Sequence, residues 1–256
     1  MAQNNIGDPV RIGTRGSPLA LIQANQVRDG LLAAHDGLEV EIVVIRTSGD
    51  RIQDRPLADV GGKGLFTKEI EEAMLDKRID LAVHSMKDVE TWLPDGFVID
   101  AILERADPRD GFIGRDADRL ADLPEGAVVG TSSLRRQSQV LAARPDVRVE
   151  SIRGNVETRL AKLAAGECDA TLLAVSGLVR LGKGDVLTSI LEVDEMLPAV
   201  AQGAVGVEIR DSDDRLRDLL APLNHADTAT QVGAERAMLA ALDGSCRTPI
   251  GALAEF

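Results

Sequence analysis

The chain has 256 residues, of which 44% are hydrophobic and 28% are charged, and its formal net charge is −13. This composition is typical of a globular protein, and the length leaves room for two domains. The negative charge and the scarcity of aromatic residues (one Trp, four Phe and no Tyr) argue against a protein that binds nucleic acid or an anionic membrane surface.

The first twenty residues contain no basic segment followed by a continuous apolar run, and no window approaches eighteen uninterrupted apolar residues. The sequence therefore predicts neither a signal peptide nor a membrane-spanning helix. Two cysteines, Cys168 and Cys246, form no CxxC pair, and the three histidines lack the spacing of metal ligands. We expect a cytoplasmic protein without a metal site.

A short apolar run, a small polar turn and a helical pattern recur along the chain. In the first half, strands are predicted at 10–12, 40–45 and 81–83, and helices at 18–34 and 65–75. The first helix has a strong start, because Ser17 can cap it and Pro18 suits its first turn. In the second half, strands are predicted at 128–130, 147–152 and 171–175, with helices at 134–143 and 156–165. This alternation predicts an α/β fold with largely parallel sheets.

Two stretches could carry the chain between domains. The first is the polar, proline-containing segment 104–108, and the second is the segment 196–199, which precedes a strand-like run at 204–209. Two crossings that enclose a middle segment suggest one domain inserted into another. A further unit begins near Asn224 with a helix predicted from Thr228 to Leu242.

Positive charge is concentrated in one part of this acidic chain. Residues 131–160 contain six arginines against three acidic residues. Arg135, Arg136 and Arg153 follow predicted strand ends, as do Arg15 and Lys87 in the first half. Because helix N-termini and arginine side chains both favour anions, these residues predict a site for a polyanion, either carboxylate or phosphate. The alternative is that the arginines lie on solvated helix faces and pair with Asp146, Glu150 and Glu157.

Three further positions could take part in chemistry. The glycine-rich segment around Lys63 lacks the spacing of a phosphate-binding loop, so a flexible loop that carries one lysine is the simpler interpretation. Asp88 lies beside Lys87 just after a strand, where a carboxylate could accept N–H bonds or stabilise a cation, or else merely cap a helix. Cys246, beside Arg247 in a Gly- and Pro-containing loop, is either a nucleophile or an inert thiol.

Nine segments, taken together and in order, resemble the porphobilinogen deaminase family, whose members are also called hydroxymethylbilane synthases. They are RIGTRGSPLAL (11–21), GGKGLFTKEIE (61–71), DLAVHSMKDV (80–89), ERADPRDGFI (104–113), GTSSLRRQ (130–137), RGNVETRL (153–160), GLVRLG (177–182), LPAVAQGAVGVE (197–208) and GSCRTPIGA (244–252). The resemblance implies a transferase that joins four porphobilinogen units head to tail into hydroxymethylbilane, with loss of one ammonia per unit. It also implies a dipyrromethane cofactor held by a thioether to Cys246.

The resemblance assigns roles to individual residues. Asp88 matches the catalytic carboxylate, which would stabilise the azafulvene-like cation formed when ammonia leaves. The positions expected to bind the cofactor are Cys246, Ser85, Lys87, Asp88, Thr131, Ser133, Arg135, Arg136, Arg153, Gly154 and Asn155. Those expected to bind the substrate are Arg15, Ser17, Arg153, Arg159, Arg180 and Lys63. Each pyrrole ring carries an acetate and a propionate, which accounts for the arginines of an acidic protein.

The fold implied by the resemblance has two domains like those of periplasmic binding proteins, with mixed, largely parallel sheets. Domain 1 would comprise 1–103 and 204–221, and domain 2, inserted into it, would comprise 109–198. Residues 224–256 would begin an α+β third domain with the cofactor cysteine, truncated here because the family usually continues for several dozen residues. A monomer is expected. The competing hypothesis is a non-catalytic, two-lobed protein that binds a polycarboxylate, which leaves the cysteine loop unexplained.

Overall fold

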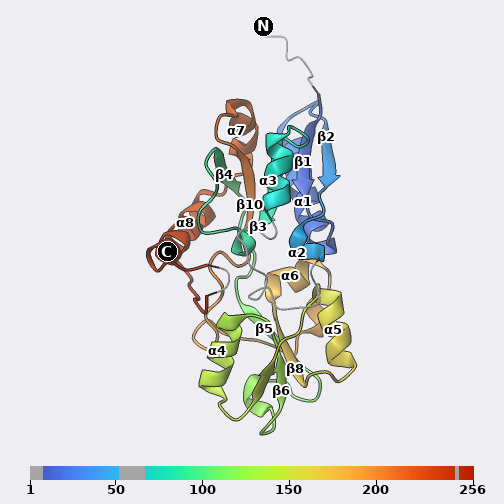
Figure 1. Ribbon diagram of the computed structural model, residues 1–256, viewed down its shortest axis with the longest axis vertical. Coiled ribbons are helices and arrows are strands. Elements are labelled where there is room, and N and C mark those ends of the chain that lie inside the picture. The colour runs from blue at the N-terminus through green and yellow to red at the C-terminus, as the bar shows by residue number, and fades with distance from the viewer. Residues whose placement is uncertain (1–7, 52–66, 246–247) are drawn as a thin grey trace. The chain divides into compact units, whose positions relative to one another are not determined.

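The computed structural model describes residues 8–51, 67–245 and 248–256. Within these ranges the chain forms two compact units: unit 1 contains residues 8–51, 67–104 and 204–230, and unit 2 contains residues 105–203, 231–245 and 248–256. Each unit has a sheet with helices, so the predicted α/β class is confirmed (Figure 1). None of the helices in the described ranges combines the length and the apolar character that crossing a membrane requires.

The described part of unit 1 contains a sheet with the strand order β2-β1-β3-β10-β4. Its strands are β1 (Val10–Thr14), β2 (Val40–Val44), β3 (Leu81–Ser85), β4 (Phe97–Ile102) and β10 (Val205–Arg210). Strand β1 is parallel to β2 and β3, whereas β10 is antiparallel to both of its neighbours. Helices α1 (Pro18–Ala34) and α7 (Asp214–Leu220) contribute residues to one buried apolar cluster that includes residues of this sheet. Helix α3 (Lys68–Leu75) contributes to a second apolar cluster.

The sheet of unit 2 has the order β7-β6-β8-β5-β9 among the residues described there. Its strands are β5 (Asp110–Gly114), β6 (Val128–Gly130), β7 (Arg148–Glu150), β8 (Ala170–Ala174) and β9 (Ser189–Ile190). Neighbouring residues of β8 point to opposite faces: Leu172 packs in a cluster with Val140 of α4 (Leu134–Ala143), and Leu173 packs with residues of α5 (Val156–Ala164) and α6 (Val175–Arg180). Figure 1 shows α4 and α5 on the two sides of this sheet.

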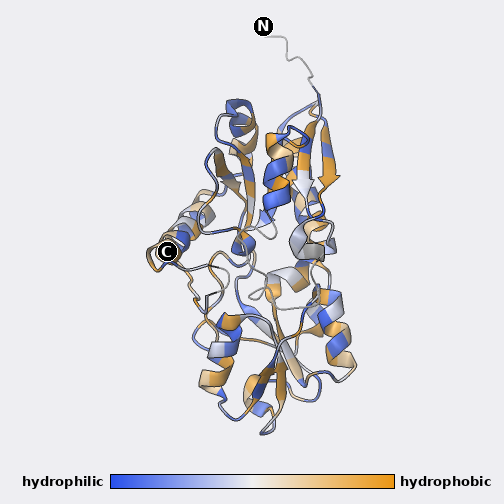
Figure 2. Ribbon diagram, in the orientation of Figure 1, coloured by the Kyte–Doolittle hydropathy of each residue, from blue (hydrophilic) through white to orange (hydrophobic). Residues whose placement is uncertain are grey.

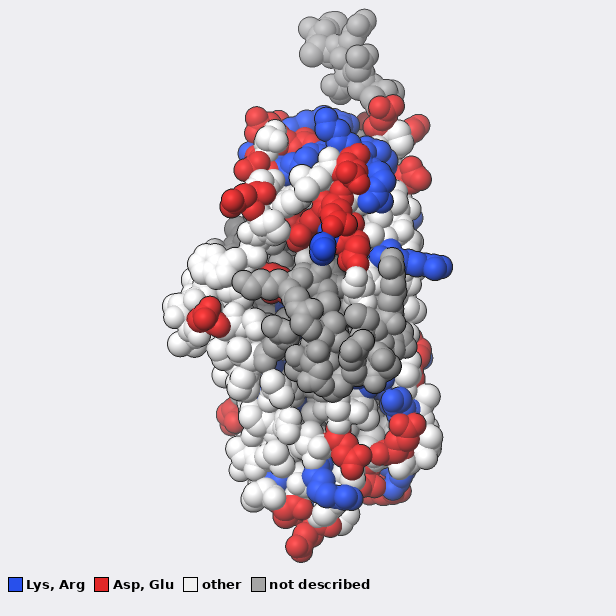
Figure 3. Space-filling view, viewed as in Figure 1, with Lys and Arg blue, Asp and Glu red and all other residues white. Residues whose placement is uncertain are grey.

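Short helices complete the described chain: α2 (Ser48–Arg51), η2 (Met86–Asp88), η3 (Leu120–Asp122), η4 (Gly184–Val186) and η5 (Ala221–Leu223). The longer helix α8 (Ala226–Ala241) begins in unit 1, and from Gln231 onward its residues belong to unit 2. In Figure 2 the strands are largely apolar, whereas helices such as α3 and α5 contain both apolar and hydrophilic residues, which is typical of helices that pack one face on an apolar core. On the face drawn in Figure 3, acidic side chains gather over α3, whose first turn contains Glu69 and Glu71.

The two sheets have equivalent topologies. In each sheet the fourth strand of the order, β10 in unit 1 and β5 in unit 2, is antiparallel to its neighbours. Strand β5 is the first strand after the chain passes Glu104 into unit 2, and β10 is the first strand after the chain passes Gly203 back into unit 1. The parallel strands β1 and β3 of unit 1, like β6 and β8 of unit 2, then end at the same edge of their sheet. Candidate residues of each unit therefore gather at one edge.

Candidate active site

In unit 1 the candidate residues lie in two turns that follow β1 and β3. The hydroxyl of Ser17 accepts a hydrogen bond from the backbone N–H of Ala20 at 3.3 Å and so caps α1, as its sequence predicts. Arg15 lies in the same turn and is partly buried. At the end of β3, Ser85 exchanges hydrogen bonds of 2.9 and 3.0 Å with the amide of Gln23, a buried residue of α1. Sequence reasoning did not identify Gln23, because it lies inside a helix without a motif of its own.

Lys87 and Asp88 form part of η2, directly after β3. Two buried side chains fix this turn, since Met86 is 1% exposed and Val89 is 4% exposed. The backbone N–H of Met86 also donates to the carbonyl of Ala204 at 3.1 Å. Between these anchors, Lys87 and Asp88 are only partly buried. The fold therefore holds a carboxylate and an ammonium group at the strand end, where they can reach a ligand.

Met86, the first residue of that turn, packs closely against the backbone of Gly206. A Cβ atom at Gly206 would lie 2.1 Å from the sulfur of Met86, and Gly206 pairs with His84 across β3 and β10. Nε2 of His84 and Oε2 of Glu208, both buried, lie 2.7 Å apart, within hydrogen-bond distance. Strand β3, which leads into the turn with Asp88, is thus fixed to β10 by a polar contact and by close packing.

In unit 2 the candidate residues lie after β6 and β7. The hydroxyl of Ser133 accepts from the N–H of Arg136 at 3.4 Å and caps α4, and Thr131 accepts from the N–H of Ser133 at 3.2 Å. The carboxamide oxygen of Asn155 caps α5 by accepting from the N–H and the hydroxyl of Thr158 at 2.9 and 2.8 Å. These side chains organise the N-termini of two helices, where backbone N–H groups and the helix dipole favour an anion.

Hydrogen bonds join these two turns. Ser132 donates to the carbonyl of Ile152 at 2.7 Å, and its hydroxyl lies 2.8 Å from that of Ser151. Gly154 has a φ of +120°, and a Cβ atom there would meet Thr158 at 2.5 Å, so this turn requires glycine.

The remaining arginine candidates of unit 2 differ in their surroundings. Arg153 lies in the turn after β7 and is partly buried. Nε of Arg159 donates to the carbonyl of Gly154 at 3.0 Å, which holds this side chain beside the same turn. Arg180 donates to the carbonyl of Gly203 at 2.8 Å, apart from these turns, and burial lowers its pKa.

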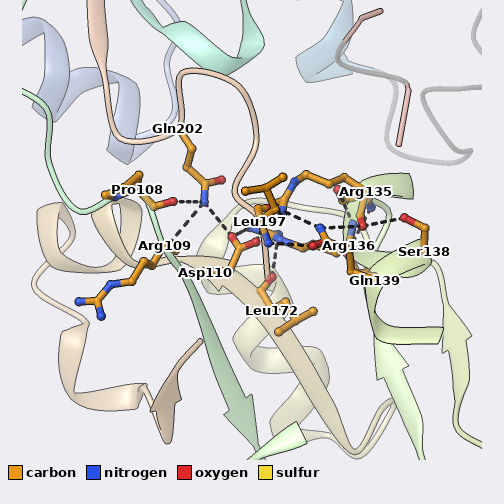
Figure 4. A network of polar contacts seen from close by, with 12 residues as sticks. Pro108, Arg109, Asp110, Arg135, Arg136, Ser138, Gln139, Leu172, Leu197 and Gln202 are labelled. Carbon is orange, nitrogen blue, oxygen red and sulfur yellow. Dashed lines mark hydrogen bonds and ion pairs between the residues drawn. The ribbon is translucent and has the colours of Figure 1, made fainter. Parts of the chain in front are cut away.

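Arg135 and Arg136 are the least exposed of the candidate arginines, all of which the structure describes. Their side chains are 4% and 6% exposed, and each forms an ion pair of 2.7 Å with a different oxygen of Asp110, which is fully buried. Arg135 also donates to the carbonyl of Leu197 at 2.7 Å, and Arg136 to that of Leu172 at 2.8 Å (Figure 4). The pair does not lie on a solvated helix face.

Sequence reasoning missed Asp110, the acidic partner of this pair. It comes from β5, 25 and 26 residues before the arginines, and the acids weighed as their partners were closer in the sequence. Arg144, by contrast, does pair with Asp146, at 2.6 Å. Lys63 and Cys246 lie outside the described residues. Among the residues that the structure describes, no group of three or more His, Cys, Asp or Glu side chains could hold a metal ion.

Comparisons with known proteins concern the family of the chain. Residues 10–218 match the family model described as the dipyrromethane cofactor binding domain of porphobilinogen deaminase, and residues 229–256 match the model of its C-terminal domain. A porphobilinogen deaminase of Nitrobacter hamburgensis is 62% identical over 94% of this chain and 77% of its own length. The chloroplastic enzyme of Oryza sativa is 59% identical over 96% of this chain and 70% of its own.

Among solved structures, a putative methionine-binding lipoprotein of Bacillus subtilis has a TM-score of 0.52, with 13% identity over 86% of this chain and 92% of its own. This likeness concerns the fold alone and agrees with the expected two-lobed architecture. The match of the cofactor-binding model over most of the chain, together with relatives near 60% identity, decides the family. The chain belongs to the porphobilinogen deaminase family.

Proposed function

We propose that this chain is a hydroxymethylbilane synthase that joins four porphobilinogen molecules head to tail, releases one ammonia per unit, and uses Asp88 as its catalytic carboxylate and Cys246 as the attachment point of a dipyrromethane cofactor. The family match supports the reaction. The observation that carries the residue assignment is the turn after β3, where buried Met86 and Val89 fix Asp88 at a strand end. A protein that only binds a polycarboxylate would not account for the family match.

The chemistry needs a fixed anion close to the reacting ring. As ammonia leaves, positive charge develops on the pyrrole, and the carboxylate of Asp88 would stabilise it while accepting a hydrogen bond from the ring N–H. The same carboxylate can move a proton as the new carbon–carbon bond forms. Lys87, beside it, would pair with a carboxylate of the ligand and so help to orient the ring.

The arginines and helix starts of unit 2 fit the cofactor. When bound, the dipyrromethane supplies the pyrrole carbon to which the first substrate unit is joined. Its acetate and propionate groups require cationic donors, and the buried Nε–H groups of Arg135 and Arg136 have no hydrogen-bond acceptor among the described residues. We propose that these two arginines, the partly buried Arg153, and the capped turns at Thr131, Ser133, Gly154 and Asn155 hold these carboxylates.

We assign the incoming substrate and the growing chain to the remaining candidates together with Arg153, which we propose serves both cofactor and substrate. Arg15, Ser17, Arg153, Arg159, Arg180 and Lys63 would bind the carboxylates added with each unit. The two cysteines, which form no CxxC pair, support a cytoplasmic location. The acidic composition supports the absence of nucleic-acid and membrane partners. We further propose that the protein acts as a monomer.

The test combines intact mass with turnover. The wild-type protein should carry the added mass of dipyrromethane, and Cys246→Ser should lose it. Asp88→Asn should keep this mass and lower turnover by about 10²- to 10⁴-fold, because its role is in the reaction and not in attachment. A folded, active protein of unmodified mass would contradict the cofactor assignment, and near-normal turnover of Asp88→Asn would remove Asp88 from the chemistry.

A further inference from the structure

The buried network around Asp110 holds two arginines with a single carboxylate. Oδ1 of Asp110 accepts from Arg136 at 2.7 Å, and Oδ2 lies 2.7 Å from a terminal nitrogen of Arg135. Among the described residues, Asp110 is the acidic side chain in ion-pair contact with these two arginines. Two guanidinium groups against one carboxylate leave a net positive charge in the interior of unit 2. An anionic ligand would offset this charge, which is costly to bury alone.

Asp110 remains ionised in spite of its burial. Burial by itself raises the pKa of this carboxyl group, but attraction from Arg136 and Arg135, with hydrogen bonds from Arg136 and Gln202, lowers the pKa well below its ordinary value. A carboxylate that is charged at neutral pH can therefore fix both guanidinium groups. It lies on β5, whereas the two arginines lie on α4. Carbonyl groups of Leu172 and Leu197 complete the fixed geometry.

Gln202 connects this carboxylate to the segment by which the chain leaves unit 2. Its Nε2 donates to Oδ1 of Asp110 at 2.8 Å and to the carbonyl of Pro108 at 2.7 Å, and the residue is 1% exposed (Figure 4). Nε of Arg105 in turn donates to the carbonyl of Gln202 at 2.9 Å. Asp110 thus lies shortly after one crossing, and Gln202 lies just before the other.

We infer that Asp110 is a positioning residue, which with Gln202 holds Arg135 and Arg136 in the orientation that receives the carboxylates of the cofactor. This inference rests on the binding role proposed above for the two arginines. Asp110 does not itself approach the ligand in this scheme, because its oxygens face the arginines and Gln202. Without its charge the guanidinium groups would lose their fixed acceptor, and ligand carboxylates would bind more weakly.

The experiment uses the full chain and compares Asp110→Asn with Gln202→Met. In Asp110→Asn, the fraction of protein that carries dipyrromethane, read by intact mass, should fall about tenfold, as expected from the loss of charge-assisted hydrogen bonds. In the fraction that keeps the cofactor, KM for porphobilinogen should rise about tenfold while kcat stays within about threefold. Gln202→Met leaves both ion pairs in place and should shift cofactor content and KM in the same direction by about threefold.

Two further variants separate the possible outcomes. Asp146→Asn removes the carboxylate partner of Arg144 elsewhere in unit 2, and its cofactor content and KM should equal those of the wild type. Asp88→Asn reports on the proposed function, so normal turnover of that variant would count against the function and not against Asp110. A folded Asp110→Asn protein with wild-type cofactor content and KM would overturn the inference, as would a loss of kcat with unchanged KM. If Asp110→Asn does not fold, wild-type values in Gln202→Met would overturn it.

Discussion

Glu235 provides the sharpest test of how unit 2 is stabilised. Its carboxylate, 1% exposed, accepts two hydrogen bonds from Arg105 at 2.6 and 3.1 Å, one from the N–H of Ala201 at 2.6 Å and one from the N–H of Ala254 at 3.0 Å. One group thus binds the segment after the first crossing, the segment before the second, and the end of the chain. We predict that Glu235→Gln is strongly destabilising.

The magnitude follows from these four contacts. Glutamine keeps one carbonyl oxygen, but its amide would turn N–H groups toward N–H donors, so at least two charge-assisted hydrogen bonds are lost at about 1.5–3 kcal/mol each. Breaking a buried ion pair by removing one partner costs about 3–5 kcal/mol, which agrees with that sum. For a chain of this size, a loss of 3–5 kcal/mol lowers Tm by roughly 6–20 °C.

The assay is thermal and urea unfolding of Glu235→Gln beside two comparison variants. Asp214→Asn removes one of two carboxylate partners of Arg217 at a site where Asp214 is 91% exposed, and it should cost less than about 1 kcal/mol. The variant Arg105→Met should be destabilised by an amount similar to Glu235→Gln, because it too leaves one buried charge of the ion pair without its partner. A Tm for Glu235→Gln within about 2 °C of that for Asp214→Asn would refute this reasoning.

Three other predictions follow from described contacts. The folded-state pKa of Asp110 lies below its unfolded value, so the contribution of this ionised carboxylate to stability is complete above about pH 4 and is lost as the pH falls further. The difference in Tm between wild type and Asp110→Asn should therefore shrink below about pH 4. Gly206→Ala should cost about 1–3 kcal/mol in urea unfolding, because the new methyl group would displace Met86, and it should also lower turnover through the adjacent Asp88. Gly154→Ala should destabilise the protein by at least about 1 kcal/mol, since the residue has a φ of +120° and its Cβ would meet Thr158, and stability like that of wild type would contradict this requirement.

Local patterns in the sequence were sufficient for most individual elements of the fold. Helix α4 spans Leu134–Ala143, the residues predicted for it, because a capping serine and an apolar face define it locally. Helix α3 spans Lys68–Leu75, and the predicted start at Leu65 lies outside the described residues. Strand β1 extends to Thr14, beyond the predicted end at Ile12. Strand β5 was not predicted as an element, because its run DGFIG is short and contains two glycines. Strand order could not be read locally, since β5 pairs with β8 across 60 residues of sequence.

In the candidate site, too, local contacts could be predicted from the sequence and long-range contacts could not. Turn residues such as Ser17, Ser133 and Asn155 could be recognised from the sequence because their capping contacts lie within three residues. Their proposed contacts with a ligand stay predictions. The partners Gln23, Asp110 and Gln202 could not be recognised, because each acts across more than twenty residues of chain.

The excess of arginine in residues 131–160 therefore has two physical origins, which charge counting cannot separate. Arg144 neutralises Asp146 and donates to three backbone carbonyls near η3, so it stabilises the fold of unit 2 and adds nothing to a ligand site. Arg135 and Arg136 share one carboxylate and bury a surplus of positive charge, which stability alone would not favour. A bound anion would offset this surplus, and our proposal that the carboxylates of the cofactor do so rests on this asymmetry more than on the number of arginines.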